Sequence, residues 1–176
     1  MKPLRLILTA AFLVWAANVL AEKNLDPVLA AGGPAVALNV ENATPRKVED
    51  TTRMAMARDY SAAWATMAEA LEQNRPELLG ANFIGDAKAT LTDTIDAQRR
   101  SNLHQHFIDK GHNVEVVFYS PEGSAIELHD TAQLELQLLD GSKLVHSEDT
   151  TVHYVVLLTA AENSWNVRLL QAVPGF

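Results

Sequence analysis

The sequence predicts an α+β domain, in which N-terminal helices pack in a curved antiparallel sheet of four strands. Between residues 50 and 109, apolar residues recur at helical spacing. From residue 114 to 173 they alternate instead, as they do in strands with one buried face. Short turns such as Asp140-Gly141-Ser142 join the alternating runs, which is typical of hairpins. Helices and strands that are separated along the chain indicate an α+β arrangement.

Three helices are expected in the first half. The first begins at Asp50 or Thr51, as a cap, and carries an apolar stripe of Met56, Tyr60, Ala63, Met67 and Leu71. Asn74-Arg75-Pro76 ends it and opens a short helix over 77–83. The third is expected from Gly85, with Asp86 as its cap, to Gly111, and its apolar stripe comprises Leu91, Ile95, Leu103 and Phe107.

Four strands are expected in the second half, each with one apolar face. In chain order, these faces are Val114, Val116 and Phe118; then Ile126, Leu128, Ala132, Leu134, Leu136 and Leu138; then Val152, Tyr154, Val156 and Leu158; and last Trp165, Val167, Leu169 and Val173. These faces should cover the long helix.

This order of elements, with the terminal pattern Trp165-x-Val167-x-Leu169-x-Gln171-x-Val173, resembles the nuclear transport factor 2-like superfamily. The resemblance covers about residues 50–174, and it implies a domain that spans residues 49–176. It implies a cone, in which the sheet wraps the long helix and a pocket lies between the sheet and the helices. One fold serves many functions, so the resemblance implies no particular chemistry.

The N-terminus has the pattern of a signal peptide or N-terminal anchor over residues 1–21. Lys2 and Arg5 precede an apolar run that ends in Val19-Leu20-Ala21. We therefore expect export to the periplasm, the cell surface or the medium, with a membrane tether if the segment is not cleaved. Residues 22–48 are expected to be a linker, although Val36, Leu38 and Val40 alternate and would also fit a short edge strand.

Charge and composition exclude several classes of function. The formal net charge is −8, and it becomes −10 without residues 1–21, which hold two basic and no acidic residues. Such a surface repels nucleic acid, whose binding needs clustered Lys and Arg. The chain has no cysteine, which excludes disulfides and thiolate metal sites. No cofactor motif is present.

Asp130 is the first candidate functional residue, because it interrupts the apolar phase of its strand. In an unbroken strand it would point inward, where a carboxylate needs a partner or a raised pKa, and raised carboxylates serve as acids or bases. The alternative is a bulge at His129-Asp130, which would turn the carboxylate to solvent.

His146 and Glu148 interrupt the next strand in the same way. A three-residue loop at Asp140-Gly141-Ser142 would pair Leu136 with His146 and Leu134 with Glu148. It would also place Asp130 opposite Val152, and His129 opposite His153 on the outer face. Two histidines without a third ligand do not indicate a metal site.

Tyr60 and Trp64 complete the set of pocket candidates. Cone enzymes of the superfamily use Asp-His or Asp-Tyr arrangements to move protons, and the resemblance implies that Tyr60 and Trp64 could supply a hydroxyl and an apolar wall. No enzyme motif of the superfamily aligns with this chain, and packing of both rings in the core is the alternative.

Two functions follow. The first is a non-catalytic domain that binds a partner protein or a small ligand through the pocket or the open sheet face. That face would carry Val117, Tyr119, Leu139, Val155, Leu157 and Leu170, and it could also form a homodimer. The second is a small-molecule lyase, isomerase or hydrolase that uses Asp130 with His146 or Tyr60.

Overall fold

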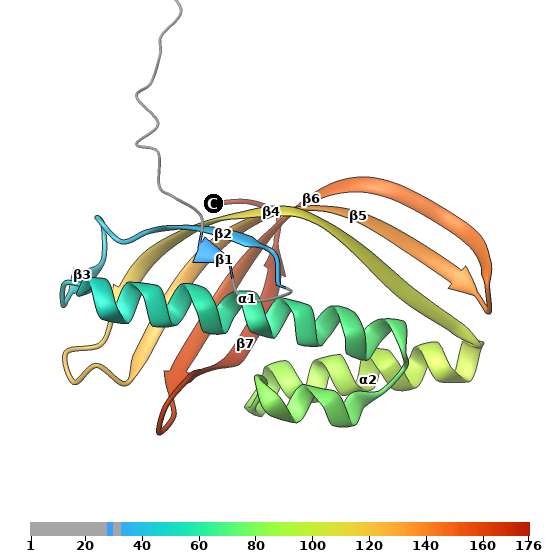
Figure 1. The fold of residues 1–176 in the computed structure, drawn as a ribbon, viewed down its shortest axis with the longest axis horizontal. Coiled ribbons are helices and arrows are strands. Elements are labelled where there is room, and N and C mark those ends of the chain that lie inside the picture. Colours follow the sequence, from blue (N-terminus) through green and yellow to red (C-terminus); the bar gives the residue numbers. More distant parts are fainter. Residues whose placement is uncertain (1–27, 30–32) are drawn as a thin grey trace, which may run out of the picture.

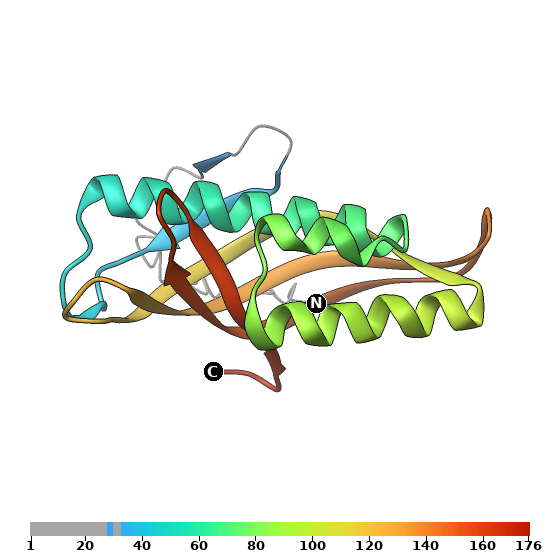
Figure 2. The same ribbon diagram turned by 90° about the horizontal axis from the view of Figure 1, so that it is seen from below.

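A computed structural model describes residues 28–29 and 33–176. The expected signal or anchor segment, residues 1–21, lies outside the described residues. Within these residues, seven strands form one sheet, in the order β1-β2-β4-β5-β6-β7, with β3 paired to β4. The long helix α1 (Asp50–Glu72) and the helix α2 (Gly85–Ser101) both lie under one face of this curved sheet (Figure 1; Figure 2 shows them from below). The predicted α+β class is confirmed.

The first helix forms because its apolar stripe is buried against the sheet. Met56, Tyr60 and Ala63 are almost fully buried, as the helical spacing predicts. The cap position is Glu49 rather than Asp50 or Thr51. A 3-10 turn, η1 (Pro76–Ala81), follows in place of the expected short helix.

The expectation that the third helix runs to Gly111 is wrong. Asn102 adopts the left-handed conformation, with φ of 55°, and ends α2 there. Leu103 and Phe107 belong instead to β4 (Leu103–Tyr119). A spacing of four residues keeps two side chains on the same face in a helix and in a strand, so this stripe could not distinguish the two. The cap of this helix is Ile84, two positions before the predicted cap Asp86.

The linker expectation is wrong for residues 33–48. These residues contain β2 (Ala35–Asn39), which pairs in parallel with β4, and β3 (Thr44–Pro45). A third short strand, β1 (Val28–Leu29), pairs with β2. The alternation at Val36 and Leu38 reflects burial, since both side chains lie in the core.

The three long strands β4, β5 (Ala125–Asp140) and β6 (Lys143–Ala160) form the centre of the sheet, and β7 (Trp165–Val173) pairs with the end of β6. The β5–β6 hairpin continues beyond β7 and arches over α2 (Figure 1). Ile126, Leu128, Leu134, Val156 and Leu158 are buried against the helices, as their phase predicts. The core therefore lies between the concave face of the sheet and α1.

The register of the β5–β6 hairpin differs from the expected one by two residues. The turn is tighter, with Asp140 opposite Lys143, and a bulge beside Leu139 shifts the pairing again. His146 therefore lies opposite Leu138, Glu148 opposite Leu136, and Asp130 opposite Tyr154. A shift of two residues keeps every side chain on its predicted face, because the side-chain period of a strand is two.

Two further bulges correct the expected outer face. A bulge between Val116 and Phe118 leaves Phe118 exposed and places Tyr119 in the core. The pairing of β6 with β7 shifts between Leu157 and Leu158, so that Arg168 is an extra residue of β7, and Leu170 turns toward the core. Tyr119 and Leu170 are therefore not part of an open apolar face.

Candidate functional site

The candidate site surrounds Asp130, which lies in the middle of β5 on the concave face of the sheet. Its carboxylate is 0% exposed, and β5 has no bulge at His129-Asp130. The alternative of a carboxylate turned out to solvent is therefore wrong. On α1, the hydroxyl of Tyr60 donates a hydrogen bond of 2.7 Å to Oδ2 of Asp130. The inward stripe of α1 thus brings a hydroxyl group to Asp130 inside the core.

His112 on β4 provides the second contact to Asp130. Its Nδ1 lies 2.8 Å from Oδ2 of Asp130, and its Nε2 lies 2.7 Å from Oδ2 of Asp109. An ionised carboxylate only accepts hydrogen bonds, so an imidazole between two carboxylates donates from both nitrogens and is an imidazolium. Burial lowers the pKa of His112, but the hydrogen bonds and charges of Asp109 and Asp130 outweigh it and raise the pKa to about 9.

Aromatic rings surround this cluster. The Trp64 ring centroid lies 4.3 Å from that of His112 and 5.5 Å from that of Tyr154, which sits opposite Asp130 on β6. Burial and the charge of Asp130 raise the pKa of Tyr154 to about 12, and burial and Asp130 also raise the pKa of Tyr60 well above its usual value. Both hydroxyls are therefore protonated at neutral pH and can donate hydrogen bonds.

One oxygen of the cluster has no partner. Oδ1 of Asp130 is buried and accepts no hydrogen bond, while Oδ2 accepts two. A buried acceptor without a partner costs free energy, and such groups are rare in folded proteins. The arrangement therefore presents a carboxylate oxygen, inside an aromatic environment, that is free to accept a proton or a hydrogen bond.

The structure brings three of the five pocket candidates together: Tyr60, Trp64 and Asp130. It does not bring His146 and Glu148 to them. Their side chains approach to 3.4 Å on the protruding part of the hairpin, where the His146 side chain is 56% exposed.

Sequence reasoning missed His112, which takes the place expected for His146. His112 shares the inward phase of Val114 and Val116, so a polar residue that interrupts this phase was a usable signal. The prediction left it out because the alternating run was taken to begin at Val114, two residues after His112.

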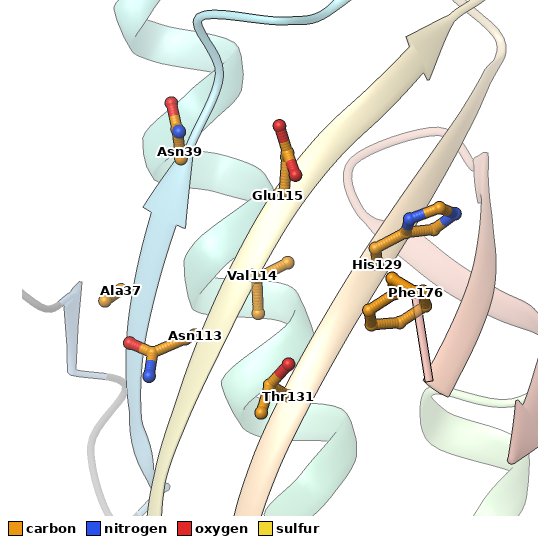
Figure 3. Close-up of a pocket in the computed structure, with 8 residues that line it drawn as sticks. All are labelled: Ala37, Asn39, Asn113, Val114, Glu115, His129, Thr131 and Phe176. Carbon is orange, nitrogen blue, oxygen red and sulfur yellow. The ribbon is translucent and has the colours of Figure 1, made fainter. Parts of the chain in front are cut away.

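A hollow lies on the opposite, convex face of the sheet and has a volume of about 260 Å³. Asn113, Glu115, His129 and Thr131 line it and point away from α1 (Figure 3). The terminal residue Phe176 stacks on His129 with the ring centroids 4.2 Å apart. His129 lies opposite Val155 rather than His153, which contacts Thr131 instead.

Within residues 28–29 and 33–176, no three His, Cys, Asp or Glu side chains gather in a geometry that could hold a metal ion. Among the same residues, no helix combines the length and the apolar character that a membrane span requires.

Comparisons with known proteins place the fold. No family model matches the sequence, and no curated protein matches it significantly. Among solved structures, the intermembrane space region of the chloroplast protein ARC6 is similar at 14% identity, with a TM-score of 0.59, over 73% of this chain and 98% of that chain.

Two further structures have lower scores. A protein of the NTF2-like family from Streptomyces avermitilis has 14% identity and a TM-score of 0.47, over 73% of this chain and 99% of that chain. A candidate scytalone dehydratase from Novosphingobium aromaticivorans has 13% identity and a TM-score of 0.47, over 66% of this chain and 83% of that chain. At these identities, the likeness concerns the fold alone. From its order of helices and its curved open sheet, this chain has the nuclear transport factor 2-like fold.

Proposed function

We propose that this protein catalyses proton transfer on a small organic molecule, as a lyase or isomerase, with Asp130 as the base. The observation that carries the proposal is the free oxygen Oδ1 of Asp130, which is buried without a partner. Tyr60 and His112 hold the other oxygen and fix the orientation of the carboxylate. A positioned carboxylate that is kept from water is the usual form of a general base.

The groups around Asp130 suggest which substrates would fit. The rings of Trp64, Tyr154 and His112 favour a flat or cyclic molecule with much apolar surface. In the proposed step, Oδ1 accepts a proton from a C–H group next to a carbonyl, and the electron pair moves onto the carbonyl oxygen. The protonated hydroxyl of Tyr154 could stabilise that oxygen, since its pKa of about 12 keeps it a donor.

Complete burial of the cluster supports a second function. Asp130 and the His112 side chain are 0% exposed, so a ligand reaches Oδ1 only when neighbouring side chains move. If they do not move, the cluster only ties α1 to the sheet, and the domain is non-catalytic. It would then bind a partner protein or a small ligand elsewhere, for example at the convex hollow beside Phe176 (Figure 3).

Exchange of hydrogen for deuterium separates the two functions without knowledge of the product. The protein is incubated in heavy water with a panel of cyclic and aromatic ketones, and loss of the C–H signals next to the carbonyl is followed by NMR. We expect at least one ketone to exchange faster than in buffer, and Asp130→Asn to abolish the difference. Asp140→Asn, at the exposed hairpin turn, is the matched control and should leave exchange unchanged. Equal exchange with the wild type and Asp130→Asn would refute the catalytic proposal.

We also propose that the chain is exported, as the pattern of residues 1–21 suggests. Mass spectrometry of protein from the native host should find an N-terminus at Glu22, or the intact chain in the membrane fraction. Intact chain in the cytosol would contradict export.

A further inference from the structure

Asp109 and His112 point to the same side of β4, although they are three residues apart. In a regular strand, side chains at an odd spacing lie on opposite faces. The pairing with β5 is interrupted between Asp109 and Gly111, so that Lys110 is an extra residue in β4. This bulge changes the phase of the strand and brings the Asp109 carboxylate to the His112 ring.

The bulge has its own fixed geometry. Gly111 has a φ of 133°, a conformation that side chains rarely adopt, and its N–H donates a 2.8 Å hydrogen bond to Oδ1 of Asp109. The other oxygen of Asp109 accepts from Nε2 of His112. The displaced Lys110 pairs with Asp149 on β6, toward the convex face. Both oxygens of Asp109 are thus held, one by the backbone and one by the ring.

We propose that Asp109 is a positioning residue for Asp130, which it controls through His112. Asp109 holds His112 charged and in one orientation, so that His112 keeps its hydrogen bond to Oδ2 of Asp130 and leaves Oδ1 free as an acceptor. The catalytic meaning of this role rests on the proposed function, whereas the control of the charge of His112 does not.

The physical reason lies in the burial of the cluster. A buried imidazolium loses the free energy of its hydration, and so does the buried carboxylate beside it. The attraction between this single pair of charges must then offset both losses. Among the described residues, two carboxylates contact the His112 ring, Asp109 on β4 and Asp130 on β5. Two tyrosines, Tyr60 on α1 and Tyr154 on β6, lie beside the carboxylate of Asp130. The two tyrosines are neutral, so Asp109 supplies the second negative charge. Its side chain is 21% exposed, whereas that of Asp130 is 0% exposed, so Asp109 keeps more contact with water.

The test follows the ring nitrogens of His112 by ¹⁵N NMR over a pH series, with Asp109→Asn as the variant. Asn keeps the size of the side chain and can still accept from Nε2, but it carries no charge. In the wild type, we expect both nitrogens to be protonated at pH 7.5 and to titrate near pH 9. In Asp109→Asn, we expect the proton affinity of His112 to fall at least tenfold, and Asp109→Glu should restore part of the loss.

The matched control is Glu148→Gln, which removes the carboxylate partner of the exposed His146 and should leave the titration of His112 unchanged. Equal titration of His112 in the wild type and Asp109→Asn would overturn the proposal. If Asp109→Asn does not fold, the wild type alone still decides, because a neutral His112 at pH 7.5 would overturn it equally. None of these measurements needs a substrate, so failure of the ketone exchange would count against the catalytic function and not against this role of Asp109.

Discussion

Raising the pH should destabilise this protein through one buried histidine. The pKa of His112 rises from an ordinary 6.5 to about 9 in the folded protein. A folded-state pKa above the unfolded value means that the folded protein binds the proton more tightly. The resulting stability is fully present below pH 6.5 and is lost as the pH rises through about 9. The difference corresponds to about 3 kcal/mol, which is a large part of the stability of an ordinary domain.

Urea unfolding at a series of pH values measures this loss. We expect the free energy of unfolding to fall by about 3 kcal/mol between pH 6.5 and pH 9.5, with the unfolding followed by circular dichroism. His112→Gln should be less stable at pH 6.5 and should lack this fall. His146→Gln changes an exposed histidine and should retain it. A flat profile for the wild type, or the same fall in His112→Gln, would refute the assignment of a charged His112.

Three substitutions extend the account. Tyr60→Phe removes a hydrogen bond to a buried carboxylate and should cost about 1.5–3 kcal/mol in urea melts, whereas an unchanged midpoint would mean that this bond is not made. Asp130→Asn leaves the imidazolium with one charged partner and should cost about 3–5 kcal/mol at pH 7, with the fold retained by circular dichroism; a more stable variant would indicate that the wild-type carboxylate is not paired. Leu134→Ala empties a core position that is 2% exposed and should cost about 2–5 kcal/mol, and a melting temperature equal to that of the wild type would invert the assigned faces of β5.

The order of helices and strands in the domain could be predicted because burial of one face makes apolar residues recur at the spacing of a helix or of a strand. The stripe of α1 and the alternation in β5 both follow directly from which side chains are buried. The phase that Asp130 shares with Leu128 and Ala132 indicated an inward position, but it did not decide between that position and a bulge at His129-Asp130.

The remaining features depend on local backbone geometry that periodicity does not report. Asn102 adopts the left-handed conformation and ends α2. The spacing of Leu103 and Phe107 fits a helix as well as the strand to which they belong. Bulges at Lys110 and Val117 change the phase of β4 at single residues, so that no run of apolar positions indicates them. The contact between His112 and Asp130 depends on β4 lying beside β5 and on the register of that pair. Register is difficult to predict from periodicity, and the expected pairing of β5 with β6 differs from the observed one by two residues.

A crystal structure with a bound ligand tests the central claim most directly, namely that the free oxygen of Asp130 is the acceptor in a functional site. The ligand is either a small molecule that stays with the protein through purification from its native host, or the ketone that exchanges fastest. We expect a hydrogen-bond donor atom or the acidic carbon of the ligand within about 3 Å of Oδ1 of Asp130, with Tyr60 and His112 still bound to Oδ2. A ligand bound only in the convex hollow beside His129 and Phe176, with the Asp130 cluster closed and unchanged, would contradict it.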